Sequence, residues 1–242
     1  MNQTGIFKAV LLIARPAAGK SEIIDYLTRL PEVERSRDFH IGRFIVIDDF
    51  PMLWSWFEED DILERLGHPR LHTTVDGNFK ETYLWDLLIE RISLEYTKFR
   101  RDAQPDDTAI IEFSRGSEHG GYRRAFEHLS DTILKDMAIL YVDVPWEESL
   151  RKNRKRFNPD KPDSILEHGL SDEKMEKLYR NIDWDDLVAG QPDYIDIKGN
   201  QVPYIIFNNH YDVTTARGAA LGDRLKNCLQ ALYLHYRKVN ER

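Results

Sequence analysis

The amino-acid sequence predicts an α/β fold with three layers, in which helices cover both faces of a mostly parallel, five-stranded sheet. A length of 242 residues suits one large domain of this class, and we expect a single domain over 1–242. Short apolar runs alternate along the chain with segments whose apolar residues recur at helical spacing. Such alternation is typical of parallel strands joined by helices that pack back onto the sheet.

The composition limits the class of protein. The mean hydropathy is −0.55 and no apolar run approaches the roughly 18 residues of a membrane span, so we expect no membrane segment. With 34 basic and 42 acidic residues the net charge is −8, which disfavours bulk binding to nucleic acid. The single cysteine, Cys228, excludes a disulfide framework. Because the apolar start of the chain is typical of a strand rather than a signal peptide, we expect a reducing, cytoplasmic location.

Five segments are predicted to form the sheet. Each is a short apolar run of the kind that is buried on both faces of a parallel sheet. They span residues 8–13, 43–47, 109–113, 138–142 and 202–207. Residues 194–197 and the last strand flank Gly199 and Asn200, so a small hairpin is expected to precede or include that strand.

Helical periodicity fills the intervals between the strands. A long segment after the second strand carries apolar residues four apart, and we expect a helical insert over about 52–107. Another helix is predicted over about 122–134, and more helices follow the fourth strand. The closing helix has on one face Leu221, Leu225, Cys228, Leu229, Leu232 and Tyr236.

The most specific signal lies between the first strand and the first helix. Residues 14–21, Ala-Arg-Pro-Ala-Ala-Gly-Lys-Ser, match the pattern G-x-x-x-x-G-K-[ST] except at the first position, where Ala14 replaces glycine. In such a loop, backbone N–H groups at a helix N-terminus bind phosphate oxygens, the lysine adds positive charge, and the hydroxyl binds Mg²⁺. A chance match at a turn before a helix is the alternative. The predicted nucleotide-binding residues are Arg15, Pro16, Ala17, Ala18, Gly19, Lys20 and Ser21.

With this loop, the chain resembles a P-loop kinase of the nucleoside/nucleotide-kinase-like group, which also includes shikimate kinases, gluconate kinases and zeta toxins. The order of elements agrees along most of the chain, whereas only the phosphate loop is specific by sequence. The resemblance implies ATP and Mg²⁺ as cofactors and Lys20 as a catalytic residue. The guanine-reading pattern N-K-x-D and the protein-kinase motifs H-R-D and D-F-G are absent from the sequence.

Acidic residues close the second and third predicted strands, at the sheet edge where open α/β folds bind ligands. In the resembling kinases an acid such as Asp48 or Asp49 holds the acceptor hydroxyl or takes its proton. Capping of the following helix is the other role open to these aspartates. Glu112 resembles a Walker-B acid, so we expect it at the metal with Ser21, and Arg115 at the acceptor. A Glu112–Arg115 ion pair within the loop is the structural alternative.

Basic residues after the fourth strand, in a region of about 147–171, resemble the lid of these kinases. Lid arginines neutralise charge on the transferring phosphoryl group. We expect this role for Arg151 or Arg154, which share a helix face, rather than for Arg156. A solvated helix with i,i+4 ion pairs, such as Glu147–Arg151, is the alternative.

The remaining candidates carry weaker signals. Asn208 and Asn209 follow the last strand, where the resembling kinases line the adenine pocket, although asparagine is also common in turns. Arg70, on a predicted loop of the insert, is a candidate for binding an anionic acceptor. Aromatic side chains of the insert either stack on a base or form the insert's own core: Trp54, Trp56, Phe57, Tyr83 and Trp85.

Together these residues favour an ATP-dependent phosphotransferase that moves the γ-phosphate to a hydroxyl or phosphate of a small molecule. The acceptor is nucleoside/nucleotide-like or sugar-acid-like, and the lid and insert exclude water from it. The alternative is an ATP-binding switch or slow ATPase that acts as a regulatory module without such an acceptor. The sequence determines neither the acceptor nor the oligomeric state.

Overall fold

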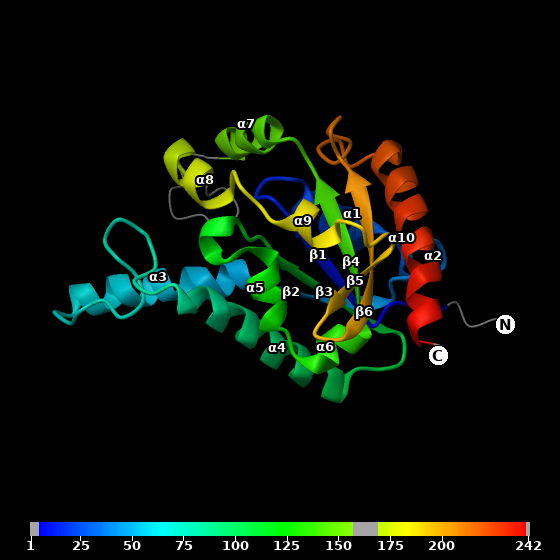
Figure 1. Ribbon diagram of the computed structural model, residues 1–242, viewed down its shortest axis with the longest axis horizontal. Helices are drawn as coiled ribbons and strands as arrows, with labels where there is room; N and C mark the ends of the chain where they lie inside the picture. Colours follow the sequence, from blue (N-terminus) through cyan, green and yellow to red (C-terminus); the bar gives the residue numbers. More distant parts are fainter. Residues whose placement is uncertain (1–4, 157–168, 241–242) are drawn as a thin grey trace.

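A six-stranded sheet forms the centre of the computed structural model, which describes residues 5–156 and 169–240 (Figure 1). The strand order is β2-β3-β1-β4-β6-β5, and all neighbours are parallel except β5 and β6. The strands are β1 (Ala9–Ala14), β2 (Arg43–Asp48), β3 (Asp107–Phe113), β4 (Met137–Asp143), β5 (Tyr194–Ile197) and β6 (Asn200–Asn208).

The prediction of a mostly parallel sheet is confirmed, but the prediction of five strands is wrong. The additional strand is β5, which pairs antiparallel with β6 at one edge of the sheet. Lys198 and Gly199 form the two-residue turn between them, with φ of 53° and 77°. Because tight hairpin turns favour positive φ at both central residues, this turn joins β5 to the sheet instead of leaving it as a loop.

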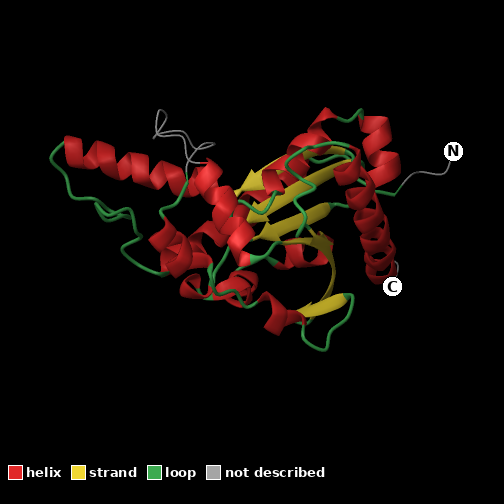
Figure 2. Ribbon diagram, turned by 90° about the horizontal axis from the view of Figure 1, so that it is seen from above, coloured by secondary structure: helices red, strands yellow, loops and turns green. Residues whose placement is uncertain are grey.

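Helices connect the strands and cover both faces of the sheet, which makes the three layers visible in Figure 2. Their bounds are α1 (Lys20–Arg29), α2 (Glu32–Phe39), α3 (Asp49–Arg65), α4 (Tyr83–Asp102), α5 (Gly121–Glu127), α6 (Asp131–Asp136), α7 (Trp146–Arg156), α8 (Asp172–Tyr179), α9 (Trp184–Val188) and α10 (Ala219–Asn240), with a 3₁₀ turn, η1 (Ser117–His119). None of these helices is both long and apolar enough to cross a membrane.

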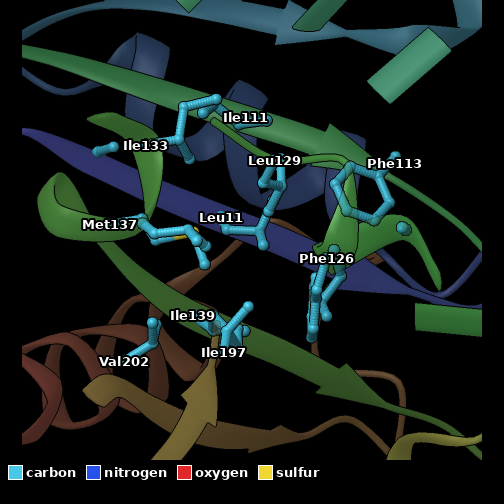
Figure 3. Packing of buried hydrophobic residues seen from close by; sticks show 14 of the residues in the cluster. Leu11, Ile111, Phe113, Phe126, Leu129, Ile133, Met137, Ile139, Ile197 and Val202 are labelled. Atoms are coloured by element: carbon cyan, nitrogen blue, oxygen red, sulfur yellow. The ribbon is translucent and has the colours of Figure 1, made fainter. Parts of the chain in front are cut away.

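Each face of the sheet has its own hydrophobic core because successive residues of a strand point to opposite sides. Leu11 belongs to the core shared with α4, α5, α6 and α9, where Figure 3 shows it near Phe126 and Ile139. Leu12 belongs to the core on the other face, shared with α1, α2 and α10. The continuous apolar run of β1 is thereby buried on both sides.

Two predicted helical segments are interrupted in the structure. The insert contains α3 and α4 with a loop over 66–82 between them, and Gly67, at φ 82°, follows the end of α3. The helix predicted over 122–134 is divided into α5 and α6. Ser130 starts the second of these, because its Oγ accepts a hydrogen bond from the backbone N–H of Ile133 at 3.4 Å.

The carboxyl ends of the parallel strands meet at one edge of the sheet, and this edge organises the candidate site. The ends of β1, β2 and β3 are adjacent there, and α7 and α8 lie at the same end (Figure 1). α3 begins at this edge and extends away from the sheet. Part of the predicted lid region, residues 157–168, lies outside the described residues.

Candidate functional site

A cavity of about 1210 Å³ lies at the carboxyl ends of β1, β2 and β3. Its lining comes from the phosphate loop, α3, the loop between α3 and α4, the start of α4, the loop after β3, α7, α8 and the loop after β6. Open parallel sheets bind their ligands at this edge. The cavity therefore has the position expected of a ligand site in such a fold.

The phosphate loop has a backbone shape that its glycine makes possible. Gly19 has a φ of 112°, a backbone conformation that residues other than glycine rarely adopt. A Cβ atom at this position would lie 2.5 Å from Oγ1 of Thr214, which belongs to the loop after β6. Gly19 is thus required both by the turn and by the close approach of a distant segment.

Side chains from three other parts of the molecule hold the carbonyl groups of this loop. The pairs are Tyr122 Oη to Ala14 O at 2.9 Å, Ser149 Oγ to Pro16 O at 2.8 Å and Asn209 Nδ2 to Ala18 O at 2.8 Å. The C=O and N–H groups of a trans peptide point in opposite directions. The N–H groups of these peptide units therefore point away from the side chains that bind their C=O groups. The loop is therefore held in one shape by the rest of the fold.

Lys20 and Ser21 line the cavity, as the prediction requires of phosphate- and metal-binding residues. Nζ of Lys20 donates to Oγ of Ser114, at the end of β3, at 2.8 Å. Arg15 differs, because its guanidinium donates to backbone oxygens of Val144 at 3.3 Å and Tyr179 at 3.4 Å. Its side chain therefore ties the loop to neighbouring segments.

Two carboxylates from neighbouring strands meet beside Lys20. Asp48 and Glu112 are paired in the register of β2 and β3, and both line the cavity. Burial, together with the negative charges of Glu112 and Asp49, raises the pKa of Asp48 to about 8. Burial also raises the pKa of Glu112, against the opposing effect of the positive charge on Lys20. This pair therefore retains a proton near neutral pH.

The two adjacent aspartates have different partners. Oδ1 of Asp48 accepts a hydrogen bond from the backbone N–H of Phe50 at 2.9 Å and so caps α3. Oδ2 of Asp49 lies 2.5 Å from a guanidinium nitrogen of Arg115, whose side chain is 2% exposed. Arg115 therefore pairs with Asp49. The Glu112–Arg115 ion pair, which was the structural alternative from the sequence, is not the pair observed.

The basic side chains of α7 are divided between the cavity and the protein surface. Arg151, Lys155 and Arg156 line the cavity, and Arg151 also donates to Glu148 at 2.7 Å. Arg154 does not line it, because its guanidinium binds the carboxylate of Asp172 on α8 at 3.0 Å. Of the two predicted lid arginines, only Arg151 is brought to the site. Arg156, which was ranked below them, joins it there.

The loop after β6 contributes residues that the sequence did not indicate. Asn208 and Asn209 are absent from the cavity lining, whereas Asp212, Thr215 and Arg217 are part of it. Asn209 is completely buried and its amide donates to the phosphate loop. No sequence motif marks residues 212–217, so this contribution depends on the return of the chain toward the phosphate loop.

The insert supplies an apolar end to the cavity. Its apolar side chains are Phe50, Leu53, Trp54, Phe57, Phe79 and Trp85, and the insert also lines the cavity with the charged Glu58, Asp61, Lys80 and Glu81. Trp56 is instead 5% exposed within the insert's own core, and Tyr83 lies outside the cavity lining. Arg70 is also outside it, because its guanidinium binds Asp61 at 2.6 Å. Trp54, Phe57 and Trp85 thus line the cavity and Trp56 belongs to the insert's core, whereas Tyr83, which is 58% exposed, does neither.

The donor set is compatible with Mg²⁺ bound together with a nucleotide. Within residues 5–156 and 169–240, no group of three His, Cys, Asp or Glu side chains is placed to hold a metal ion. Mg²⁺ in phosphoryl-transfer sites commonly uses only one or two protein oxygens and takes its other ligands from phosphate and water. The hydroxyl of Ser21 and the carboxylate of Glu112 fit this requirement.

Comparisons with known proteins give distant similarities. No protein-family model and no curated protein matches the chain. A sugar kinase from Janibacter sp. HTCC2649 is 14% identical, with a TM-score of 0.43, over 93% of this chain and 98% of that one. TT1252 from Thermus thermophilus is 16% identical, with a TM-score of 0.44, over 95% and 97%. A retinol dehydratase, solved with androsterone and the inactive cofactor PAP, is 11% identical, with a TM-score of 0.32, over 95% and 64%. These similarities are too low to indicate a function.

Proposed function

We propose that this protein is an ATP-dependent phosphotransferase that moves a γ-phosphoryl group to a hydroxyl or phosphate group of a small molecule. One observation carries the proposal: the phosphate loop and the Asp48–Glu112 pair open into the same cavity. A nucleotide phosphate on the loop and an acceptor beside the carboxylates would then be neighbours. Such positioning is the main contribution of a protein to phosphoryl transfer.

Each end of the cavity has the chemistry that its role requires. The ammonium of Lys20 and the guanidinium of Arg151 offset the negative charge of the transferring group. Asp48, in its deprotonated form, accepts the proton of the acceptor hydroxyl. Ser21 and Glu112 would hold Mg²⁺, which would supply positive charge to offset that of the phosphates. The apolar residues of the insert exclude water, which would otherwise compete with the acceptor.

The test measures the release of ADP from MgATP in the presence of each of a panel of acceptors: nucleosides, nucleotides, sugar acids and heteroaromatic alcohols. We expect at least one class of acceptor to stimulate release. Lys20→Ala should lower the stimulated rate by about a thousandfold, since it removes a charge that stabilises the transition state. Lys98→Ala is the matched control, because Lys98 lies on the exposed surface of α4 in an ion pair with Glu95.

The outcome also separates the proposal from an ATP-dependent switch. A switch would bind ATP and release ADP slowly, at a rate that no acceptor changes. Release that remains independent of every acceptor, but is lost in Lys20→Ala, would contradict the phosphotransferase and support the switch. Equal rates in Lys20→Ala and in the wild type would contradict both.

A further inference from the structure

An acid, Asp212 of the loop after β6, lines the same cavity as Lys20 of the phosphate loop. Burial alone would raise the pKa of Asp212, but hydrogen bonds from Lys152 and Thr215 outweigh burial and lower it. The carboxylate is therefore charged at neutral pH. Because a carboxylate repels a phosphate anion, an acid in a cavity proposed for a nucleotide needs a balancing charge.

The balancing charge comes from α7. Nζ of Lys152 forms an ion pair with Oδ1 of Asp212 and donates to Oγ1 of Thr214 at 3.2 Å. Lys152 is only 8% exposed, and a lysine is rarely this buried unless it is paired. A guanidinium nitrogen of Arg151, the preceding residue, lies 3.7 Å from Oδ2 of the same carboxylate. Asp212 thus ties the loop after β6 to α7 through a buried lysine.

The hydroxyl of Thr214 continues this network to the phosphate loop. It donates to Oδ1 of Asp212 at 3.3 Å and accepts from the amide of Asn209 at 2.9 Å. The same amide donates to the carbonyl oxygen of Ala18 at 2.8 Å. Thr214 and Asn209 are completely buried, and Oγ1 of Thr214 is the atom nearest to the position of a Cβ on Gly19. A chain of hydrogen bonds therefore runs from Asp212 to the backbone of the phosphate loop.

These contacts join three segments into a closed ring. α7 reaches the phosphate loop through Ser149, which donates to the carbonyl oxygen of Pro16 at 2.8 Å. The loop after β6 reaches it through Asn209. The Lys152–Asp212 pair joins α7 to the loop after β6 and completes the ring. Loss of the pair would let these two supports move apart, and the carbonyl groups that they hold would move with them.

We propose that Asp212 and Lys152 are positioning residues, whose ion pair fixes the two supports of the phosphate loop and thereby strengthens the binding of a triphosphate. This inference rests on the proposed function and deepens the role of its phosphate loop. It concerns the binding of phosphate alone, so its test requires neither an acceptor nor turnover.

Charge and position predict opposite results for Asp212→Asn. Loss of a negative charge from the cavity wall, taken alone, would tighten the binding of an anion. Loss of the ion pair releases the supports of the phosphate loop and should weaken that binding. Asparagine has nearly the same volume and tolerates the φ of 50° at this position, so the backbone of the loop should be retained. The variant therefore separates the two effects by their sign.

The probe is inorganic triphosphate with Mg²⁺, titrated by isothermal calorimetry, because it carries the phosphates of a nucleotide and no base. Asp212→Asn should weaken its binding about five- to tenfold, which corresponds to one net hydrogen bond. Glu22→Gln is the matched control, since Glu22 is another acid of the cavity lining, in the first turn of α1, outside this network. This control should bind triphosphate at least as tightly as the wild type.

Lys152→Met tests the other half of the pair, because it keeps the length of the side chain and removes the ammonium. It should weaken binding by a similar factor. The double variant Lys152→Met/Asp212→Asn leaves no unpaired buried charge, so it decides the question if a single variant fails to fold. Its loss of affinity should be no greater than that of either single variant, because the two residues act as one unit.

The affinity of Asp212→Asn decides the outcome. Unchanged or tighter binding of triphosphate in this variant would overturn the inference and leave the proposed function intact. Binding by the double variant within a factor of two of the wild type would overturn it as well. Absence of triphosphate binding in the wild type is a different result, since it would contradict the phosphate loop of the proposed function itself.

Discussion

The two ends of the cavity are built in opposite ways. The phosphate end consists of eight consecutive residues, 14–21, and side chains from elsewhere hold three of their carbonyl groups. The apolar end gathers single side chains from α3, α4 and the loop between them. In the proposed phosphotransferase, backbone groups of the phosphate end would bind a common chemical unit, and side chains of the apolar end would distinguish one acceptor from another. Between them lie the carboxylates of β2 and β3.

The largest effect is expected between the two ends, at Asp48. Asp48→Asn should lower acceptor-dependent turnover by about 10²- to 10⁴-fold, because the amide cannot accept the acceptor's proton. Asparagine caps helices as well as aspartate does, so α3 should remain intact. The measurement is the steady-state rate with saturating MgATP and the best acceptor. Turnover within a factor of two of the wild type would contradict the assignment of Asp48 as the base.

The raised pKa of Asp48 adds a pH dependence to the same variant. The deprotonated form increases as pH rises through about 8, so kcat/KM of the wild type should rise over pH 6–9. A carboxyl whose pKa is higher in the folded than in the unfolded protein contributes to the free energy of unfolding. This contribution is fully present below the pKa of the unfolded state and is lost as the pH rises through the pKa of the folded state. The wild type should therefore lose thermal stability over this range, and Asp48→Asn should lose less of it.

A smaller effect, on stability, is expected at the buried ion pair beside the apolar end. Asp49→Asn should lower the free energy of unfolding by about 3–5 kcal/mol, because Arg115 would remain charged and 2% exposed without its partner. Denaturant unfolding measures this change. Asp102→Asn is the control, since the exposed Arg101–Asp102 pair should contribute nothing measurable. Equal unfolding midpoints for the two variants would contradict this difference.

The contrast between the two ends also explains how much the sequence could predict. The turn between β1 and α1 was predictable because Gly19 and Lys20 mark a contiguous backbone shape, whereas the binding roles of its residues stay a prediction. The strands were predictable from their apolar runs, and the acids at the ends of β2 and β3 from the strand boundaries. These features depend on local sequence, which is why they were found.

Features that depend on long-range packing were not predictable in the same way. Asn209 was predicted near the adenine but holds the phosphate loop, because the chain returns to that loop only in the folded protein. Arg154 was predicted on the same helix face as Arg151, yet it pairs with Asp172 of α8 and lies outside the cavity lining. His119 lay between other motifs without a signal of its own. Its place in the cavity lining depends on how the turn after β3 packs against α8.

A moderate effect is expected where a distant residue supports the phosphate end. Asn209→Ala removes the bonds to Ala18 and Thr214 and should raise KM for ATP about five- to 100-fold, or about 1–3 kcal/mol. KM for the acceptor should change little. Asn208→Ala is the matched control, because this exposed neighbour bonds the backbone N–H of His210 at 3.2 Å. Equal KM values for ATP in the two variants would contradict a supporting role for Asn209.

The smallest effect is expected at the outer wall of the apolar end, where Lys174 of α8 meets the loop of the insert. Its Nζ donates to the carbonyl oxygens of Asp76 and Gly77, the second at 3.2 Å. Lys174→Ala should raise KM for the acceptor about two- to fivefold, because these partly exposed hydrogen bonds hold the wall of the apolar end. KM for ATP should stay unchanged, because Lys174 does not contact the phosphate loop. Lys98→Ala, on the exposed surface of α4, is the control. A rise in KM for ATP would mean that α8 affects both ends together. The two ends of the cavity would then act as one unit, and the division between backbone binding and side-chain selection would fail.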